Sequence, residues 1–176
     1  IKARWFMDKA EHTKLVRELI DAVKAEKVQP WNGKKVILSG IMAEPDEFLD
    51  IFSEFNIAVV ADDLAQESRQ YRNDVPSGID PLEQLAQWWQ DFDGCPLAMN
   101  PDKPRGQMLI DMAKKYDADA VVICMMRFCD PEEFDYPIYK VEFEKAGLRY
   151  TVVDVDLESP SLEQIRTRIQ AFSEIL

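Results

Sequence analysis

Four short apolar runs, separated by longer amphipathic segments, constrain the fold of this chain more than any other feature. They lie at residues 34–40, 57–60, 118–126 and 148–155, and valine and isoleucine recur in them. A strand with one face in water alternates apolar and polar residues, whereas nearly continuous apolar runs indicate strands buried on both faces. With helices between them, these runs predict an α/β fold: a three-layer, Rossmann-like domain with a mainly four-stranded parallel sheet and helices on both faces.

Helix-forming patterns fill most of the remaining sequence. Apolar residues recur there at three- and four-residue spacing, and proline, serine or acidic residues mark the starts. The predicted helices cover residues 2–26, 45–55, 81–90, a segment after 104–106, 131–147 and 161–176. We expect a break near Pro137 and an N-cap at Ser161 or Ser159. The polar connection 61–81 exceeds the ~12 to 15 residues of an ordinary loop, which favours a functional loop.

The charge balance argues against two classes of partner. The chain carries 33 acidic residues against 21 lysines and arginines, a formal net charge of −12 at pH 7. An anionic protein of this kind is poorly suited to nucleic acid or to an anionic membrane surface. The sequence also lacks a run of 18 apolar residues and the apolar centre of a signal peptide. Its three cysteines, an odd number, suit a reducing compartment, so we expect a cytoplasmic protein.

Chain length and the turn-forming residues 29–33 predict the domain organisation. A chain of 176 residues suits one domain with a core of its own. Residues 1–30 are expected to form a leading helix and linker, and residues 31–176 the α/β domain. Because the chain begins at Ile1 rather than at a methionine, we expect it to be processed or to be a piece of a longer protein.

Parallel strands place their C-terminal ends at one edge of the sheet, which is where α/β proteins bind ligands. The expected loops at this edge are 39–44, the residues from Asp62 onward, 126–130, and the residues from Asp156 onward. Neither glycine-rich nucleotide-binding motif, G-x-G-x-x-G or G-x-x-x-x-G-K-[ST], occurs in the chain. The single histidine, His12, falls in the leading helix, and we interpret it as a solvated or packing residue.

The three cysteines differ in their local context. Cys129 follows the third apolar run and precedes a helix that begins at Pro131, where backbone amides favour a thiolate that could bind a metal or act as a nucleophile. An ordinary small residue in a turn fits the same position. Cys124 lies within the apolar run and is interpreted as an inert core residue, and Cys95, between glycine and proline, as structural or incidental. No C-x2-C pair occurs, so a self-contained zinc or iron–sulfur site is poorly supported.

Acidic pairs and methionines are weaker candidates. The pairs Asp62 and Asp63, and Asp154 and Asp156, fall at strand ends, where they could bind a hard cation, cap a helix or face water. Methionines are more typical of a core or of a soft apolar pocket than of a metal site. Those considered are Met42, Met99, Met108, Met112, Met125 and Met126.

Four separated motifs carry a resemblance to a known family. They lie at residues 40–47 (GIMAEPDE), 60–70 (VADDLAQESRQ), 125–133 (MMRFCDPEE) and 164–172 (QIRTRIQAF). On these motifs the chain resembles the 2-hydroxyacyl-CoA dehydratase and benzoyl-CoA reductase family, and within it the β-subunit type of the 2-hydroxyglutaryl-CoA dehydratase D component. The likeness runs from the leading helix to the C-terminus.

The resemblance implies a specific cofactor, reaction and set of partners. Such proteins are heterodimers in which each subunit holds a 4Fe-4S cluster between two α/β domains through three cysteines. An ATP-dependent activator injects one electron, and the acyl-CoA substrate passes through a ketyl radical that expels its hydroxyl group. The resemblance therefore implies a companion α subunit, an activator protein and an acyl-CoA substrate, and makes this chain part of a (R)-2-hydroxyacyl-CoA dehydratase, a lyase.

The family pattern also implies which residues matter. Its C-terminal domain supplies one cluster ligand, and the matching position here is Cys129 in the Phe-Cys-Asp-Pro motif. The other two ligands have no counterpart, so residues 31–176 are expected to be the C-terminal domain of a longer subunit and to be inactive alone. The residues expected to line the cluster cleft are Ser39, Gly40, Glu44, Asp62, Asp63 and Arg69.

Two other functions remain open. One is a reductase of the benzoyl-CoA type, which would use the same electron relay without losing water. The other is a non-enzymatic relative that serves as an activator or a cluster-maturation partner. In either case the substrate and the roles of Cys95 and Cys124 stay undetermined.

Overall fold

A computed structural model describes residues 2–78, 80–97, 100–156 and 161–176. The chain divides into two compact units, Ile1–Asn32 and Gly33–Leu176. Of the sequence-based candidates, Met99 and Ser159 lie outside the described residues. None of the helices in the described ranges combines the length and apolar content needed to cross a membrane.

The first unit contains two helical elements rather than the one helix predicted for residues 2–26. A short 3-10 helix, η1 (Lys2–Trp5), precedes α1 (Lys9–Ala25). The interruption has a local cause, because the Asp8 carboxylate accepts hydrogen bonds from the backbone N–H groups of Ala10 (2.8 Å) and Glu11 (3.2 Å) and so starts a new helix. His12 lies half-buried in α1. No residue of α1 is buried, although its sequence is amphipathic.

The second unit is built on a four-stranded sheet. Its strands are β1 (Lys34–Gly40), β2 (Ile57–Leu64), β3 (Ala120–Met126) and β4 (Arg149–Val155). They are parallel throughout and lie in the order β2-β1-β3-β4. The predicted parallel sheet is therefore confirmed, with each strand at or within one to four residues of its expected run.

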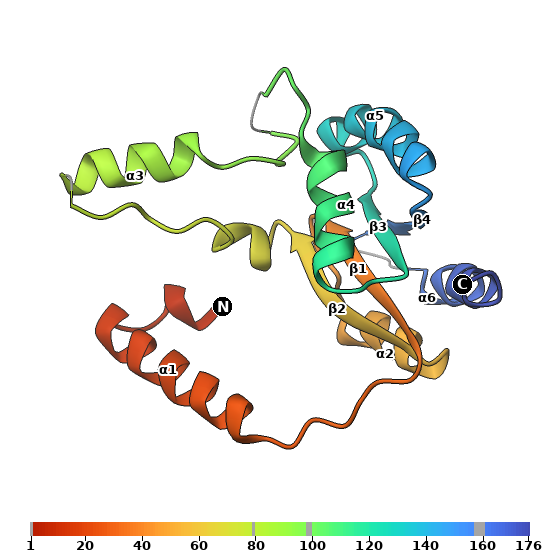
Figure 1. Ribbon diagram of the computed structural model, residues 1–176, viewed down its shortest axis with the longest axis horizontal. Coiled ribbons are helices and arrows are strands. Elements are labelled where there is room, and N and C mark those ends of the chain that lie inside the picture. The colour runs from red at the N-terminus through yellow and green to blue at the C-terminus, as the bar shows by residue number, and fades with distance from the viewer. Residues whose placement is uncertain (1, 79, 98–99, 157–160) are drawn as a thin grey trace. The chain divides into compact units, whose positions relative to one another are not determined.

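Helices cover both faces of this sheet, as Figure 1 shows. Helices α2 (Asp46–Glu54) and α6 (Leu162–Ser173) cover one face, and α4 (Arg105–Lys115) and α5 (Asp130–Ala146) cover the other. Successive side chains of a strand point to opposite faces, so Val36 and Leu38 pack toward α2 and α6, while Ile37 packs toward α4 and α5. Both faces of the central strands are buried, and the prediction of a three-layer fold is confirmed. Cys124 is fully buried among these side chains, as its core assignment predicts.

The connection between β2 and α4 is shorter than its sequence suggests. Strand β2 continues four residues beyond its predicted end, because it stays paired with β1 as far as Gly40 and Leu64. Two aspartates lie in this extension, and their charge is what concealed it. A 3-10 turn, η2 (Ser68–Gln70), and helix α3 (Pro81–Gln90) occupy the rest of the connection.

The predicted helix break at Pro137 does not occur. Helix α5 is continuous, with Pro137 inside it. A proline costs a helix one backbone hydrogen bond and crowds the preceding turn. Here Pro137 is exposed, and Tyr139, two residues later, packs into the core between α4, α5 and the sheet.

The core makes a first prediction about stability. Phe48 on α2 is 0% exposed and stacks edge-on against Phe52, whereas its neighbour Leu49 is 41% exposed. We expect Phe48→Ala to lower the free energy of unfolding by about 3–5 kcal/mol through lost burial and a residual cavity. Leu49→Ala is the matched control and should cost less than about 1 kcal/mol. Urea unfolding followed by circular dichroism measures both, and equal losses would contradict the assigned packing of α2.

Candidate functional site

The strand order creates a topological switch point at the C-terminal edge of the sheet. From β1 the chain moves to β2 on one side, and β3 lies on the other side. The loops after β1 and β3 therefore run in opposite directions, and ligands of open α/β sheets bind at such a switch point. Ser39 and Gly40 end β1 beside this switch point, and the turn after β3 leads to Cys129.

Asp63 and Arg69 form a fully buried pair next to these residues. The Arg69 Nε and Nη2 atoms donate to the two carboxylate oxygens of Asp63 at 3.2 and 3.1 Å. Nη2 also donates to the backbone carbonyls of Asp63 (2.8 Å) and Gly40 (3.0 Å). One guanidinium group thus ties the end of β2 to the end of β1.

Arg105 and Glu132 extend this pair to the helices. Arg105 Nη2 donates to the Ser39 hydroxyl at 3.0 Å, and Ser39 donates to Asp63 at 3.1 Å. Arg105 Nη1 lies 3.1 Å from a Glu132 carboxylate oxygen, and Arg69 Nη1 lies 3.7 Å from the same oxygen. We call Asp63, Arg69, Arg105 and Glu132 the buried ion network. It joins β2, the 3-10 turn η2, α4 and α5, and β1 through Ser39.

The network changes the proton affinity of its members. Burial on its own would raise the pKa of Asp63, but Arg69, Arg105 and Arg72 outweigh it and hold that pKa below its usual range. Burial would lower the pKa of Arg105, and the facing carboxylates of Asp63 and Glu132 raise it instead. Asp63 is therefore a carboxylate at neutral pH, and its oxygens are committed to arginines rather than to a cation.

Cys129 lies where the sheet edge passes into α5. It occupies the N-cap position, is half-buried and is not in a disulfide. The turn before it is held by a hydrogen bond from the Cys129 backbone N–H to the Met126 carbonyl, 3.2 Å long. Phe128 adopts a φ of 65°, which a bulky side chain rarely tolerates, and its ring is 93% exposed. A strained turn thus presents a thiol at the N-terminus of a 17-residue helix.

Comparison with known proteins identifies the family to which this geometry belongs. The sequence model of the family described as 2-hydroxyglutaryl-CoA dehydratase, D-component, matches residues 1–176. The chain belongs to this family. It is 55% identical to the lactoyl-CoA dehydratase subunit beta of Anaerotignum propionicum, over 99% of this chain and 47% of that protein. It is 45% identical to the (R)-phenyllactyl-CoA dehydratase beta subunit of Clostridium sporogenes, over 100% of this chain and 47% of that protein.

A third dehydratase relative is more distant. The beta subunit of (R)-2-hydroxyglutaryl-CoA dehydratase from Acidaminococcus fermentans is 30% identical over 100% of this chain and 48% of that protein. The chain therefore spans about half the length of the curated relatives it matches. The resemblance to β subunits of this family is confirmed, although identity is higher to the lactoyl-CoA protein than to the 2-hydroxyglutaryl-CoA protein.

The dehydratase family implies an iron–sulfur cluster, which this chain fits only in part. Among the described residues, no group of three histidine, cysteine or acidic side chains is placed to hold a metal ion. Cys124 is fully buried, and burial followed by the charge of Glu132 raises the pKa of its thiol far above the usual range. Cys95 is half-buried, with its sulfur 3.9 Å from Arg69 Nη1. Among the three cysteines, Cys129 is the one that combines partial exposure with a position at a helix N-terminus.

The six predicted cleft residues divide into two groups. Ser39, Gly40, Asp63 and Arg69 are brought together in the buried ion network or at its border. Asp62 is half-buried beside them, where its carboxylate accepts hydrogen bonds from the backbone N–H groups of Leu64 and Ser68, both 3.0 Å long. It shapes the turn after β2. Glu44 is half-buried in the loop between β1 and α2.

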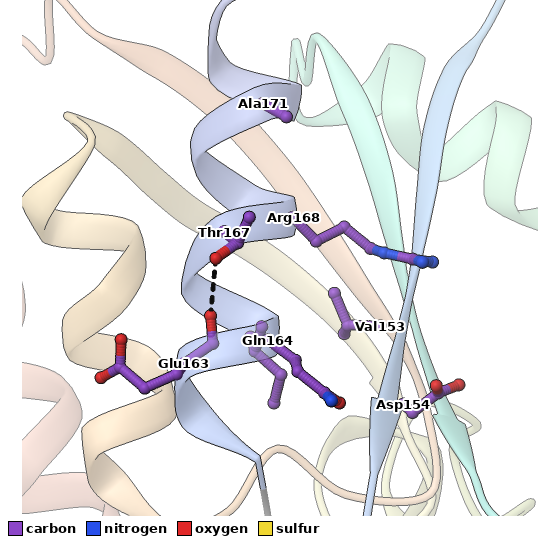
Figure 2. A pocket seen from close by; sticks show the side chains of 8 residues that line it. Val153, Asp154, Glu163, Gln164, Thr167, Arg168 and Ala171 are labelled. Carbon is purple, nitrogen blue, oxygen red and sulfur yellow. Dashed lines mark hydrogen bonds between the residues drawn. The ribbon is translucent and has the colours of Figure 1, made fainter.

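A separate pocket lies between β4 and α6, with a volume of about 700 Å³ (Figure 2). Asp154 and Val153 line it from the strand, and Arg168 lines it from the helix. Arg168 Nη1 donates to the Val152 carbonyl of the same strand at 2.7 Å. Neither Cys129 nor any of the six predicted cleft residues lines this pocket.

Sequence analysis missed two members of the site, Arg105 and Glu132, whereas Arg72 lies in the segment after Asp62 that was expected at this edge. Arg72 pairs with Asp63, and the other two complete the buried ion network. Arg105 follows a proline at a helix start, and Glu132 sits in the acidic first turn of α5, both ordinary positions for exposed charges. The one available signal was Gly106, where an added Cβ would fall 1.7 Å from Glu142 Oε2 and 2.8 Å from Tyr139 Cβ. A glycine inside a helix pattern indicates such a close approach of backbone to a neighbour.

The buried ion network makes a prediction about stability. Asp63→Asn removes a charge that faces three arginines and leaves them without their main counter-ion. We expect a loss of about 3–5 kcal/mol in the free energy of unfolding. The control is Asp117→Asn, which breaks an exposed ion pair with Lys35 and should change stability little. Denaturant unfolding compares the two, and a small loss for Asp63→Asn would contradict the network.

The same aspartate predicts a dependence of stability on pH. The folded pKa of Asp63 lies below the value of about 3.9 for an aspartate in an unfolded chain. The carboxylate therefore stabilises the fold at pH values above that unfolded pKa, and this contribution is lost as the pH falls toward the folded pKa. In thermal melts from pH 6 to pH 2.5, we expect wild type to lose more stability on acidification than Asp63→Asn does. Parallel curves would show that Asp63 is not held as a carboxylate.

Proposed function

We propose that this chain is the C-terminal domain of a subunit of a 2-hydroxyacyl-CoA dehydratase, and that Cys129 is a ligand of its 4Fe-4S cluster. The observation that carries the proposal is the position of Cys129, a half-buried thiol at the N-terminus of α5, beside the switch point of the sheet. Thiolates are the usual ligands of such clusters. Names of the relatives support the reaction class, since each denotes the dehydratase of a 2-hydroxyacyl-CoA.

A cluster bound at this site would supply one-electron transfer to the substrate thioester, for loss of the hydroxyl group by way of a ketyl radical. This chain's residues hold one side of the site. The turn Met126–Cys129 fixes the ligand at the sheet edge, and the buried ion network fixes the first turn of α5 behind it. The remaining ligands would come from residues outside this chain, so the fragment is inactive alone.

The partners follow from the same proposal. The relatives are named beta subunits, which supports a companion α subunit. We further infer an ATP-dependent activator as electron donor, an acyl-CoA thioester as substrate, and a cytoplasmic location. Three cysteines without a disulfide among them support a reducing compartment.

The proposal predicts a specific loss of iron. In the full-length subunit with its companion, reconstituted with iron and sulfide under anaerobic conditions, Cys129→Ala should lose most of the iron and of the visible absorbance of this subunit's cluster. Cys95→Ala is the matched control, because Cys95 is also a half-buried free thiol, and it should retain both. Iron analysis and electron paramagnetic resonance measure the outcome. Retention of a reducible cluster in Cys129→Ala would refute the ligand assignment.

Turnover by the same preparation separates the alternatives. With activator, ATP and reductant, a dehydratase converts a 2-hydroxyacyl-CoA to the enoyl-CoA, whereas a benzoyl-CoA type of reductase reduces the aromatic thioester without loss of water. A preparation that binds its cluster and turns over neither substrate would favour a maturation or activator role and contradict the proposed reaction.

A further inference from the structure

Helix α1 carries an apolar surface that the described residues of its own unit leave uncovered. Five large apolar side chains recur on it at positions i, i+1, i+4, i+5 and i+8, and each is between 38% and 63% exposed: Leu15, Val16, Leu19, Ile20 and Val23. We call these five residues the apolar face of α1. By the helical period, the exposed side chains of Arg17, Asp21 and Lys24 lie on the opposite side.

The width of the apolar face indicates what kind of structure covers it. With 3.6 residues per turn, the five side chains span roughly 140° of the helix circumference. The seam of a two-helix coiled coil is narrower, because it uses the a and d positions of a heptad alone. A stripe wider than about 100° is typical of a helix that packs against the core of a folded domain. The apolar face therefore suits a layer of a domain better than one helix of a second copy.

The α/β unit completes its own core without α1. Its two hydrophobic clusters, one on each side of the sheet, draw on buried residues between Val36 and Phe172. Val36, Ile37 and Val121 in the central strands are 0% exposed, so α2 and α6 on one side and α4 and α5 on the other already cover them. The apolar face of α1 is thus not a missing part of this core.

The segment after α1 has the features of a domain boundary. Helix α1 ends at Ala25, residues 26–32 are exposed and belong to no helix or strand, and β1 begins at Lys34. Exposed connections with proline and polar residues are typical of domain boundaries, and this one contains Pro30 and Asn32. The division of the chain into two compact units falls at the same place. Along the sequence, α1 therefore lies before the boundary and the sheet lies after it.

The relatives have the length of chain that such a layer needs. The match to the (R)-phenyllactyl-CoA dehydratase beta subunit covers 100% of this chain, α1 included, and 47% of that protein. For the lactoyl-CoA dehydratase subunit beta the matched share of the protein is also 47%. More than half of each relative lies outside the matched segment, which is enough for a further domain.

We propose that α1 is the last helix of the domain that precedes the α/β domain in the full-length subunit, and that its apolar face packs into the core of that preceding domain. The inference rests on the proposed function, which makes this chain the C-terminal domain of a longer subunit. Residues 26–32 are then the linker between the two domains. Burial of the five apolar side chains drives the docking, and the Asp8 cap fixes where the docked helix begins.

Hydrogen exchange read by mass spectrometry tests the proposal in the full-length subunit, measured alone and with its companion. In the subunit alone, we expect the amides of Lys9–Ala25 to exchange slowly, because packing of the apolar face holds the helix closed. Leu19→Gln should speed their exchange by about tenfold or more, since it removes a buried leucine. Arg17→Gln is the matched control: it introduces the same side chain on the opposite side, at similar helix propensity, and should leave the exchange unchanged.

Photo-cross-linking identifies the structure that covers α1. In the heterodimer, p-benzoylphenylalanine in place of Leu19 should cross-link to a peptide of the same subunit that precedes this chain, and the same group in place of Arg17 should not. This group is large and apolar, so the measurement also serves if Leu19→Gln does not fold. Cross-links to residues 33–176, to a second copy or to the companion subunit would overturn the inference.

Two exchange results would overturn it as well: equal exchange in Leu19→Gln and Arg17→Gln, or exchange of α1 that is fast in the subunit alone and slows only with the companion. Neither measurement depends on iron. Failure of the proposed function would appear separately, as a wild-type subunit that binds no cluster or as a Cys129→Ala variant that keeps it.

Discussion

Charge neutralisation at the end of β2 is the constraint on which the C-terminal edge of this domain depends. Asp63 is 0% exposed, and burial of a lone carboxylate would cost several kcal/mol in effective terms. Arg69 and Arg105 offset that cost because they are buried beside Asp63. Their own burial calls for a further carboxylate, and Glu132 supplies it by facing both of them. Removal of any one member leaves the others buried with an unbalanced charge. The edge of the sheet is therefore fixed as one unit rather than as independent loops.

The packing of the α4 and α5 layer follows from the same constraint. Arg105 can reach Glu132 only if α4 lies close to α5, and Gly106 provides that approach, since the space beside it is filled by Glu142 and Tyr139. The Tyr139 ring lies 5.5 Å from the Arg105 guanidinium carbon and shields the network from one side. The packing of α4 against α5 therefore also brings Arg105 to Glu132, three residues after Cys129.

The sequence predicted what depends on local pattern and missed what depends on burial of charge. The strands could be found because Val36 to Leu38 and Ala120 to Ile123 are continuous apolar runs. The end of β2 could not be found from the sequence, because Asp62 and Asp63 resemble loop residues until their hydrogen-bonding partners are known. Arg105 and Glu132 lie 66 and 93 residues after Ser39 of β1, beyond any pattern that a sequence window can detect, and their contact exists only after the sheet has formed. Cys129 was identified from a family motif and from its place before a helix, whereas the ion pairs that Glu132 of the same helix makes were not identified.

The geometry suits the role proposed for Cys129 as one ligand, since the described residues form no complete metal site. Ligands that converge from separate parts of a protein must each be rigid beforehand, or binding must supply the free energy to order them. Cys129 meets this requirement: its backbone is held by the turn from Met126, its helix is anchored through Glu132, and the core side of the turn is filled by β3. The strained φ of Phe128 is tolerated because these contacts determine the turn from both sides. In the proposed enzyme, this domain therefore contributes a fixed thiol and a fixed local charge, and the cluster is completed by residues that meet it at the sheet edge.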